Sequence, residues 1–139
     1  MLVENSKKRI FVADDSKDFL SIMQSILEFA GFLVETSEDA EEALDQIQKL
    51  QYDLLVLGVV MPRVDGIRLL HMVRNSKQYA AVPVIFITGA SNKKVMETHL
   101  RETDTKAEGY IRKPFKNKAF LEMLTALLGK PKEGGAQYN

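Results

Sequence analysis

The stretch YDLLVLGVVMPRVDG, residues 52–66, constrains this chain more than any other. An uninterrupted apolar run, Leu54–Leu57, is followed by Gly58 and then by turn signals at Pro62 and Gly66. A short apolar run bounded by turn residues is typical of a strand buried on both faces, as in the middle of a parallel sheet. Open parallel sheets bind their ligands beyond the carboxyl ends of the strands. The function should therefore depend on the surroundings of residue 58.

Strands and helices alternate along the whole chain. Apolar or mixed runs predict five strands, at 10–13, 32–36, 54–57, 83–88 and 109–112. Segments with helical spacing of apolar residues predict five helices, at 16–30, 39–47, 66–73, 92–102 and 117–128. The first, third and fourth strands are apolar throughout and should be central, whereas the second and fifth are mixed, as edge strands are. The pattern predicts a three-layer α/β fold, a parallel five-stranded sheet of order 2-1-3-4-5 with helices on both faces.

Two helices carry the more informative apolar patterns. In the first helix we expect the buried stripe to comprise Phe19, Ile22, Met23, Ile26 and Ala30. The helix at 92–102 has few apolar anchors, namely Val95, Met96 and Leu100. Weakly packed elements of this kind are the ones most free to shift.

The length of 139 residues corresponds to one domain, which we expect at residues 9–129, between an extension at 1–8 and a flexible tail at 130–139. Lys plus Arg and Asp plus Glu number 19 each, so charge does not favour direct binding to nucleic acid. The absence of cysteine excludes disulfides and thiolate metal sites. No run has the length of a membrane span, and the N-terminus lacks the apolar region of a signal peptide. We expect a cytoplasmic protein that does not bind membranes.

Polar side chains follow several of the predicted strands at the point where each strand ends. Asp14 and Asp15 follow the first strand, Thr88 ends the fourth, and Lys113 follows the fifth. The carboxyl ends of parallel strands meet at one edge of a sheet, so two carboxylates, a hydroxyl and an ammonium should converge there. The third strand, in contrast, ends at Gly58, which has no side chain to contribute.

This constellation resembles the receiver domain of bacterial two-component response regulators, over roughly residues 8–128. The resemblance implies that Asp14 and Asp15 hold Mg²⁺, and that Thr88 and Lys113 contact a phosphoryl group. It also implies that Tyr110 is an aromatic residue that rotates on activation, and that the peptide bond between Lys113 and the following proline is cis.

The departure from the family pattern is Gly58. The family motif Asp-x-x-Met-Pro-x-x-Asp-Gly is present at residues 58–66 with glycine in place of the phosphoacceptor aspartate. Phosphoryl transfer to a receiver needs a carboxylate nucleophile, and glycine offers none. Asp53 should lie at the opposite end of the strand and Asp65 should point away from the crevice, so neither replaces it. We expect a pseudo-receiver that is not phosphorylated by the usual route.

The missing carboxylate also weakens the expected metal site. Asp14, Asp15 and the backbone carbonyl of Val60 could hold Mg²⁺ loosely, and no other cofactor is expected. An equally open interpretation is that Lys113 pairs with Asp14 or Asp15 in a structural salt bridge. Tyr110 is as easily an edge-strand aromatic as a switch.

The sequence thus predicts a non-enzymatic module of phosphorelay signal transduction that acts by protein–protein interaction. Partners would be a histidine kinase, a phosphotransfer or output protein, or a second copy, through the face formed by 92–102, 109–112 and 117–128. One alternative is an ordinary phospho-accepting regulator seen as a Gly58 variant, natural or engineered. Another is a Mg²⁺-dependent or nucleotide-binding enzyme, which the acidic, glycine-free turn after the first strand disfavours. His71 and His99 have no partner at metal-ligand spacing, so we expect surface or boundary positions.

Overall fold

The computed structural model describes residues 7–61, 65–89, 93–102 and 107–129. Its strands are β1 (Arg9–Ala13), β2 (Leu33–Ser37), β3 (Leu54–Gly58), β4 (Val84–Thr88) and β5 (Gly109–Arg112). Its α-helices are α1 (Lys17–Phe29), α2 (Ala40–Lys49), α3 (Gly66–Arg74), α4 (Lys93–Glu102) and α5 (Asn117–Leu128). A short 3₁₀ helix, η1 (Lys77–Tyr79), was not predicted. Most of the expected N-terminal extension and all of the expected tail, 130–139, lie outside the described residues.

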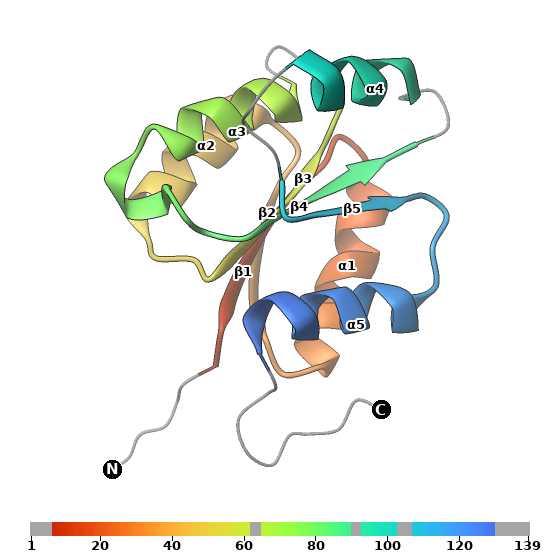
Figure 1. Cartoon of the computed structure of the whole chain (residues 1–139). Coiled ribbons are helices and arrows are strands. Elements are labelled where there is room, and N and C mark those ends of the chain that lie inside the picture. Colours follow the sequence, from red (N-terminus) through yellow and green to blue (C-terminus); the bar gives the residue numbers. More distant parts are fainter. Residues whose placement is uncertain (1–6, 62–64, 90–92, 103–106, 130–139) are drawn as a thin grey trace.

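The five strands form one parallel sheet of order β2-β1-β3-β4-β5, as predicted (Figure 1). The β3 strand is central, pairing with β1 on one side and β4 on the other. All five of its residues are buried, because both faces of the sheet are covered. The carboxyl ends of β1, β3 and β4 therefore meet at one edge.

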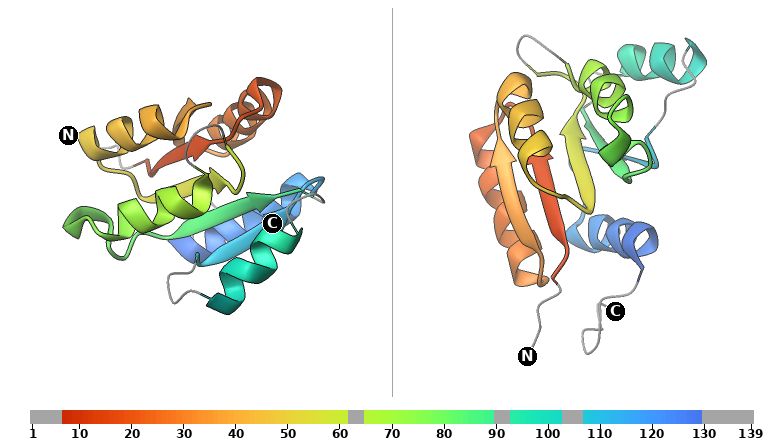
Figure 2. Two further views of the ribbon diagram at one scale, coloured as in Figure 1. Left: turned by 90° about the horizontal axis from the view of Figure 1, so that it is seen from above. Right: turned by 90° about the vertical axis from the view of Figure 1, so that its left-hand side faces the viewer.

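Side chains alternate between two hydrophobic layers along each strand. Phe11 of β1 and Leu55 of β3 face the layer that contains α2, α3 and Met96 of α4. Val12 of β1 and Val56 of β3 face the layer that contains α1 and α5. The ribbon views show these two helical layers on opposite faces of the sheet (Figures 1 and 2). A strand can be apolar at every position only in such a sandwich, as the sequence indicated.

Side-chain caps begin the first three helices close to the strand ends. The Phe19 N–H donates to Ser16 Oγ (3.1 Å) at the start of α1, and the Arg68 N–H donates to Asp65 Oδ1 (2.8 Å) at the start of α3. Asp39 caps α2 by accepting a hydrogen bond from the Glu41 N–H. Such caps satisfy N–H groups that have no partner within the helix.

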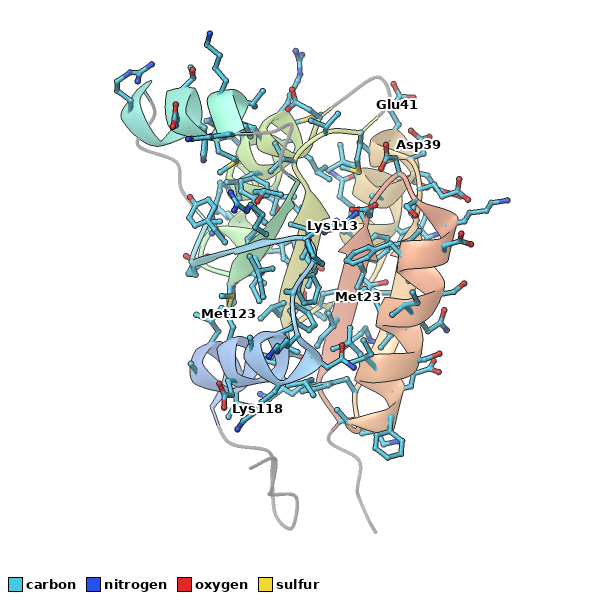
Figure 3. The ribbon with its side chains drawn as sticks, turned by 90° about the vertical axis from the view of Figure 1, so that its right-hand side faces the viewer. Met23, Asp39, Glu41, Lys113, Lys118 and Met123 are labelled. Carbon is cyan, nitrogen blue, oxygen red and sulfur yellow. The ribbon has the colours of Figure 1, made fainter. Side chains whose placement is uncertain are left out.

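The predicted buried stripe of α1 is wrong in part. The residues buried against the sheet are Leu20, Met23 and Leu27, whereas Ile22 is 57% exposed. Met23 points from α1 toward the sheet (Figure 3). Two apolar stripes with helical spacing lie side by side on this helix, and periodicity cannot choose between them. The rotation of α1 relative to β1 decides which of the two stripes is buried.

The predictions for α4 and His99 also need correction. Met96 is buried as expected, but Val95 is 41% exposed, and the Leu100 side chain lies outside the described part of the chain. His99 is buried rather than superficial, and its ring packs edge-to-face on Phe86 at 5.7 Å between centroids. An imidazole can replace an aliphatic side chain at such a helix–sheet contact because its ring packs on an aromatic partner. Within the described ranges, none of the helices is long and apolar enough to cross a bilayer.

Candidate functional site

A cavity of about 230 Å³ lies at the carboxyl ends of the central strands. The residues that line it include six that the sequence singled out: Asp14, Asp15, Gly58, Val60, Thr88 and Lys113. They come from the ends of four strands that are far apart along the chain. The predicted convergence of these residues is therefore observed, although their roles are a separate question.

A second cavity, of about 320 Å³, is larger but is a weaker candidate for the functional site. It lies beside β2 and the end of α1 and is lined by Lys7, Arg9, Glu28, Glu35 and the apolar residues Phe32, Leu33 and Val34. Arg9 and Glu35 pair with each other across it (3.4 Å) and are each about one-third exposed. We therefore place the candidate site in the smaller cavity, where a buried acidic side chain is present.

Asp14 is the buried charge of the site, with 3% of its surface exposed. Its Oδ1 atom accepts a hydrogen bond from the Ser16 N–H (3.0 Å), and both carboxylate oxygens lie 3.3 Å from Lys113 Nζ. Burial raises the pKa of the Asp14 carboxyl above its ordinary value of 3.8, because the charged form loses water. The Ser16 N–H and the Lys113 ammonium lower that pKa but only in part, and nearby Asp15 raises it further.

Lys113 reaches the site from the end of β5 and ties several segments together. Its N–H donates to the Thr88 carbonyl (2.7 Å), which joins the ends of β5 and β4, and its peptide bond with Pro114 is cis, as expected. Its ammonium lies 4.0 Å from the centroid of the Phe19 ring in α1, a cation–π contact. Figure 3 shows the side chain extending toward β1 and α1. The contact with Phe19 could not be predicted from the sequence, because it depends on how α1 is placed.

Gly58 leaves room that Asp14 uses. A Cβ atom built on Gly58 would lie 2.9 Å from Asp14 Oδ2 and 3.5 Å from the Ala13 carbonyl oxygen. The first distance is shorter than real Cβ contacts. Any side chain at residue 58 must therefore push the Asp14 carboxylate away from its present position, where Ser16 and Lys113 hold it.

Gly66 has a different reason to be glycine. A Cβ atom there would lie 1.9 Å from the carbonyl oxygen of Gly58, a backbone atom that cannot move aside. The Gly66 N–H donates to the Val59 carbonyl (2.9 Å), so the start of α3 packs directly on the end of β3. Asp65 is exposed and caps α3, which agrees with the expectation that it points away from the crevice.

The oxygen donors around the cavity form an incomplete set for a metal ion. Asp14 and Asp15 supply carboxylates, and the exposed Val60 could add its backbone carbonyl. No cluster of three or more acidic or histidine side chains suited to a metal occurs among the described residues. Both oxygens of Asp14 already face the Lys113 ammonium. A cation would therefore have to compete with the Lys113 ammonium for the Asp14 carboxylate.

Tyr110 lies behind the site rather than in its lining. It is half-buried on β5, and its hydroxyl accepts a hydrogen bond from the Ala107 N–H (3.0 Å). Its ring packs at 5.8 Å from Phe86, whose other neighbour is His99 of α4 (5.7 Å). Three rings thus connect β5 and α4 through β4. The role of Tyr110 as a switch stays a prediction, whereas the buried position of His99 was not expected, because a single histidine on a polar helix resembles a surface residue.

Comparison with known proteins gives one consistent family. The model of the response regulator receiver domain matches residues 10–125. Response regulator MprA of Mycobacterium avium is 32% identical over 124 residues, which is 89% of this chain and 52% of MprA. MprA of Mycobacterium sp. (strain KMS) is 32% identical over 128 residues, 91% of this chain and 54% of the relative. This chain therefore spans about half the length of these curated relatives.

Solved structures agree with the fold. Chemotaxis response regulator CheY4 of Vibrio cholerae has a TM-score of 0.77 and 29% identity, covering 88% of this chain and 100% of CheY4. The receiver domain of the sensor histidine kinase PA1611 of Pseudomonas aeruginosa has a TM-score of 0.80 and 21% identity, covering 90% and 100%. That structure contains a magnesium ion coordinated in its active site cleft. At 21% identity, the likeness to PA1611 concerns the fold alone.

Proposed function

This chain belongs to the response regulator receiver domain family, and from that premise we propose that it is a pseudo-receiver, whose signalling does not depend on phosphorylation at the end of β3. One observation carries the proposal. The end of β3 is Gly58, in a cavity where Asp14 and Lys113 already satisfy each other's charge. An acyl phosphate forms on a carboxylate oxygen, and β3 supplies none there.

The buried ion pair would keep the pocket in one arrangement. Lys113 contacts Asp14 on one side and the Phe19 ring on the other, so its ammonium is not available to an incoming phosphoryl group without loss of both contacts. A phosphoryl group would also meet two carboxylates in place of a nucleophile. The module would therefore act as a binding partner in two-component signalling, without enzymatic activity of its own.

Magnesium binding, where it occurs, would be weak. Asp14, Asp15 and the Val60 carbonyl would hold the ion, and it would neutralise negative charge in the cavity. The PA1611 receiver domain, which shares this fold, holds a magnesium ion in its active site cleft. Here, however, the ion must displace the Lys113 ammonium from Asp14.

We assign residues 9–129 to the receiver domain and the partner-binding face to α4, β5 and α5. The support is the sparse anchoring of α4. Met96 and His99 are buried on this helix, whereas Lys93, Lys94 and Val95 are exposed. Among its described side chains, α4 is anchored only by Met96 and His99, and an element held in this way can shift at low cost when a partner binds. A kinase, a phosphotransfer or output protein, or a second copy of the chain would be the partner.

Intact mass after incubation with acetyl phosphate and Mg²⁺ tests the proposal. The parent chain should stay unmodified, Gly58→Asp should gain one phosphoryl group, and Gly58→Asn should not, because it adds similar bulk without a nucleophile. The Gly58→Asp gain would show that Thr88, Lys113 and the acidic pair are otherwise competent. A phosphoryl group on the parent chain would overturn the proposal, and peptide mapping would locate the acceptor.

A further inference from the structure

The outer side of α1 carries an apolar stripe that the fold leaves partly exposed. Its members are spaced i, i+3, i+7 and i+10, which keeps them on one side of a helix: Phe19, Ile22, Ile26 and Phe29. Phe29 is 96% exposed and Ile22 57% exposed, while Phe19 and Ile26 are half-buried. The stripe lies beside the buried one formed by Leu20, Met23 and Leu27, so α1 is apolar on two adjacent sides. Figure 3 shows α1 at the outer edge of the molecule.

Charge is sparse along this part of the helix. Residues 19–29, FLSIMQSILEF, include a single charged residue, Glu28, whereas α4 has the sequence KKVMETHLRE. An exposed helix of a protein that acts alone normally has charged residues on its solvent side. Depletion of charge around aromatic and aliphatic anchors is the composition of the centre of a protein–protein interface. The stripe is therefore more than a set of single exposed apolar residues.

The spacing of the stripe identifies what it fits. Residue 24 is its midpoint, with Phe19 and Phe29 equally far on either side and Ile22 and Ile26 equally far within. In an antiparallel pair of such helices about a two-fold axis, Phe19 lies beside the partner's Phe29 and Ile22 lies beside the partner's Ile26. Every apolar residue then meets one of its own size and kind. This self-complementarity is what an isologous contact between identical subunits requires.

We propose that a second copy of this chain docks here, through an antiparallel contact between the two α1 helices. The helix dipoles support the antiparallel direction of the pairing. Antiparallel helices place the positive end of one dipole beside the negative end of the other. A helix of this length forms only a short contact with its partner, so the dimer should be weak and concentration-dependent. The contact lies on the helical layer opposite α4 and leaves the face of that helix open.

Sedimentation velocity of the full chain, from micromolar to millimolar concentration, should reveal a reversible dimer. Ile22→Lys should raise the dissociation constant by about tenfold or more, because a charge enters both sides of the contact, while the melting temperature stays close to the parent value. The matched control is Val95→Lys, which changes an apolar residue of α4 that is 41% exposed and should leave the dimer intact. A chain that is monomeric throughout would overturn the proposal and leave the stripe to a helix of another protein. Loss of the dimer in Val95→Lys but not in Ile22→Lys would overturn it in favour of the α4 face.

Cross-linking tests the direction of the pairing, and the chain has no cysteine of its own to interfere. Ile22→Cys and Ile26→Cys are purified separately and oxidised alone or as a mixture. The antiparallel pairing places residue 22 beside residue 26 of the other copy, so the mixture should form disulfide dimers faster than either protein alone. Disulfides form only when the two Cα atoms are about 4.4–6.8 Å apart. Equal rates in the mixture and in the separate proteins would refute the antiparallel arrangement.

Discussion

Removing the Lys113 side-chain charge should destabilise the protein in a pH-dependent way. Lys113→Met keeps an apolar stem over the Phe19 ring but leaves the Asp14 carboxylate, which is 4% exposed, without its ammonium donor. Breaking a buried ion pair in this way costs about 3–5 kcal/mol. The Lys113 side chain is 34% exposed, so water weakens its electrostatic attraction to Asp14. We therefore expect a loss of about 1–3 kcal/mol in the free energy of unfolding at neutral pH.

The dependence on pH follows from Asp14. Burial raises its pKa above 3.8 in the folded protein, so the stabilisation that protonation brings is complete below pH 3.8 and is lost as pH rises through the folded-state pKa. Lys113 is one of the groups that lower this pKa, so Lys113→Met raises it further. The difference in stability between parent and variant should therefore be largest at neutral pH and should shrink toward acid.

Urea denaturation across that pH range measures both effects, because urea, unlike guanidinium, does not screen charge. The same substitution is made in an Asp14→Asn background, which has no carboxylate to leave unpaired. There Lys113→Met should cost little, since only its contact with Phe19 changes. A loss that stays constant from neutral to acidic pH, or that is equally large in the Asp14→Asn background, would contradict the assigned pairing.

The remaining predictions concern packing and a buried hydroxyl. Gly66→Ala should destabilise by about 3 kcal/mol or more in thermal denaturation, because its Cβ would meet the Gly58 carbonyl oxygen at 1.9 Å. Gly109→Ala should cost less, since the nearest atom, Met123 Sδ at 2.8 Å, belongs to a flexible side chain; an equal loss at both sites would refute this ranking. Tyr79→Phe should cost about 1–3 kcal/mol in urea, because the buried Tyr79 hydroxyl donates to the Ile47 carbonyl (2.7 Å); an unchanged midpoint would contradict that role. Burial also raises the Tyr79 pKa, so the parent should lose stability above pH 10.0, where the unfolded chain ionises first, and Tyr79→Phe should lose less.

Much of the fold was predictable because it depends on local patterns. The apolar runs of β1, β3 and β4 required a sheet covered on both faces, and the mixed runs of β2 and β5 required edges, so the strand order was predicted correctly. Asp39 and Asp65 are caps that satisfy helix N–H groups only a few residues away. The Asp-Gly pair at 65–66 indicates a turn; in the structure Asp65 caps α3, and the close approach of the Gly58 carbonyl explains why Gly66 is glycine.

The errors arise where two local solutions are equally good. The two apolar stripes of α1 have the same helical spacing, and the sequence alone led to the choice of Ile22 over Leu20 and Leu27. His99 was expected at a surface or boundary position because it has no partner at metal-ligand spacing, yet its ring fills a contact with Phe86. Periodicity and residue type describe a helix by itself, whereas burial depends on its rotation against the sheet.

The sequence by itself determined which residues reach the carboxyl edge of the sheet, and that residue 58 brings no carboxylate to it. A parallel strand order and a list of strand ends are sufficient for that conclusion. Only the tertiary structure shows that Lys113 forms an ion pair with Asp14. The physical reason is distance: the attraction between buried charges depends on separations of a few ångströms, and Asp14 and Lys113, 99 residues apart along the chain, reach 3.3 Å only when β1, β5 and α1 are packed together.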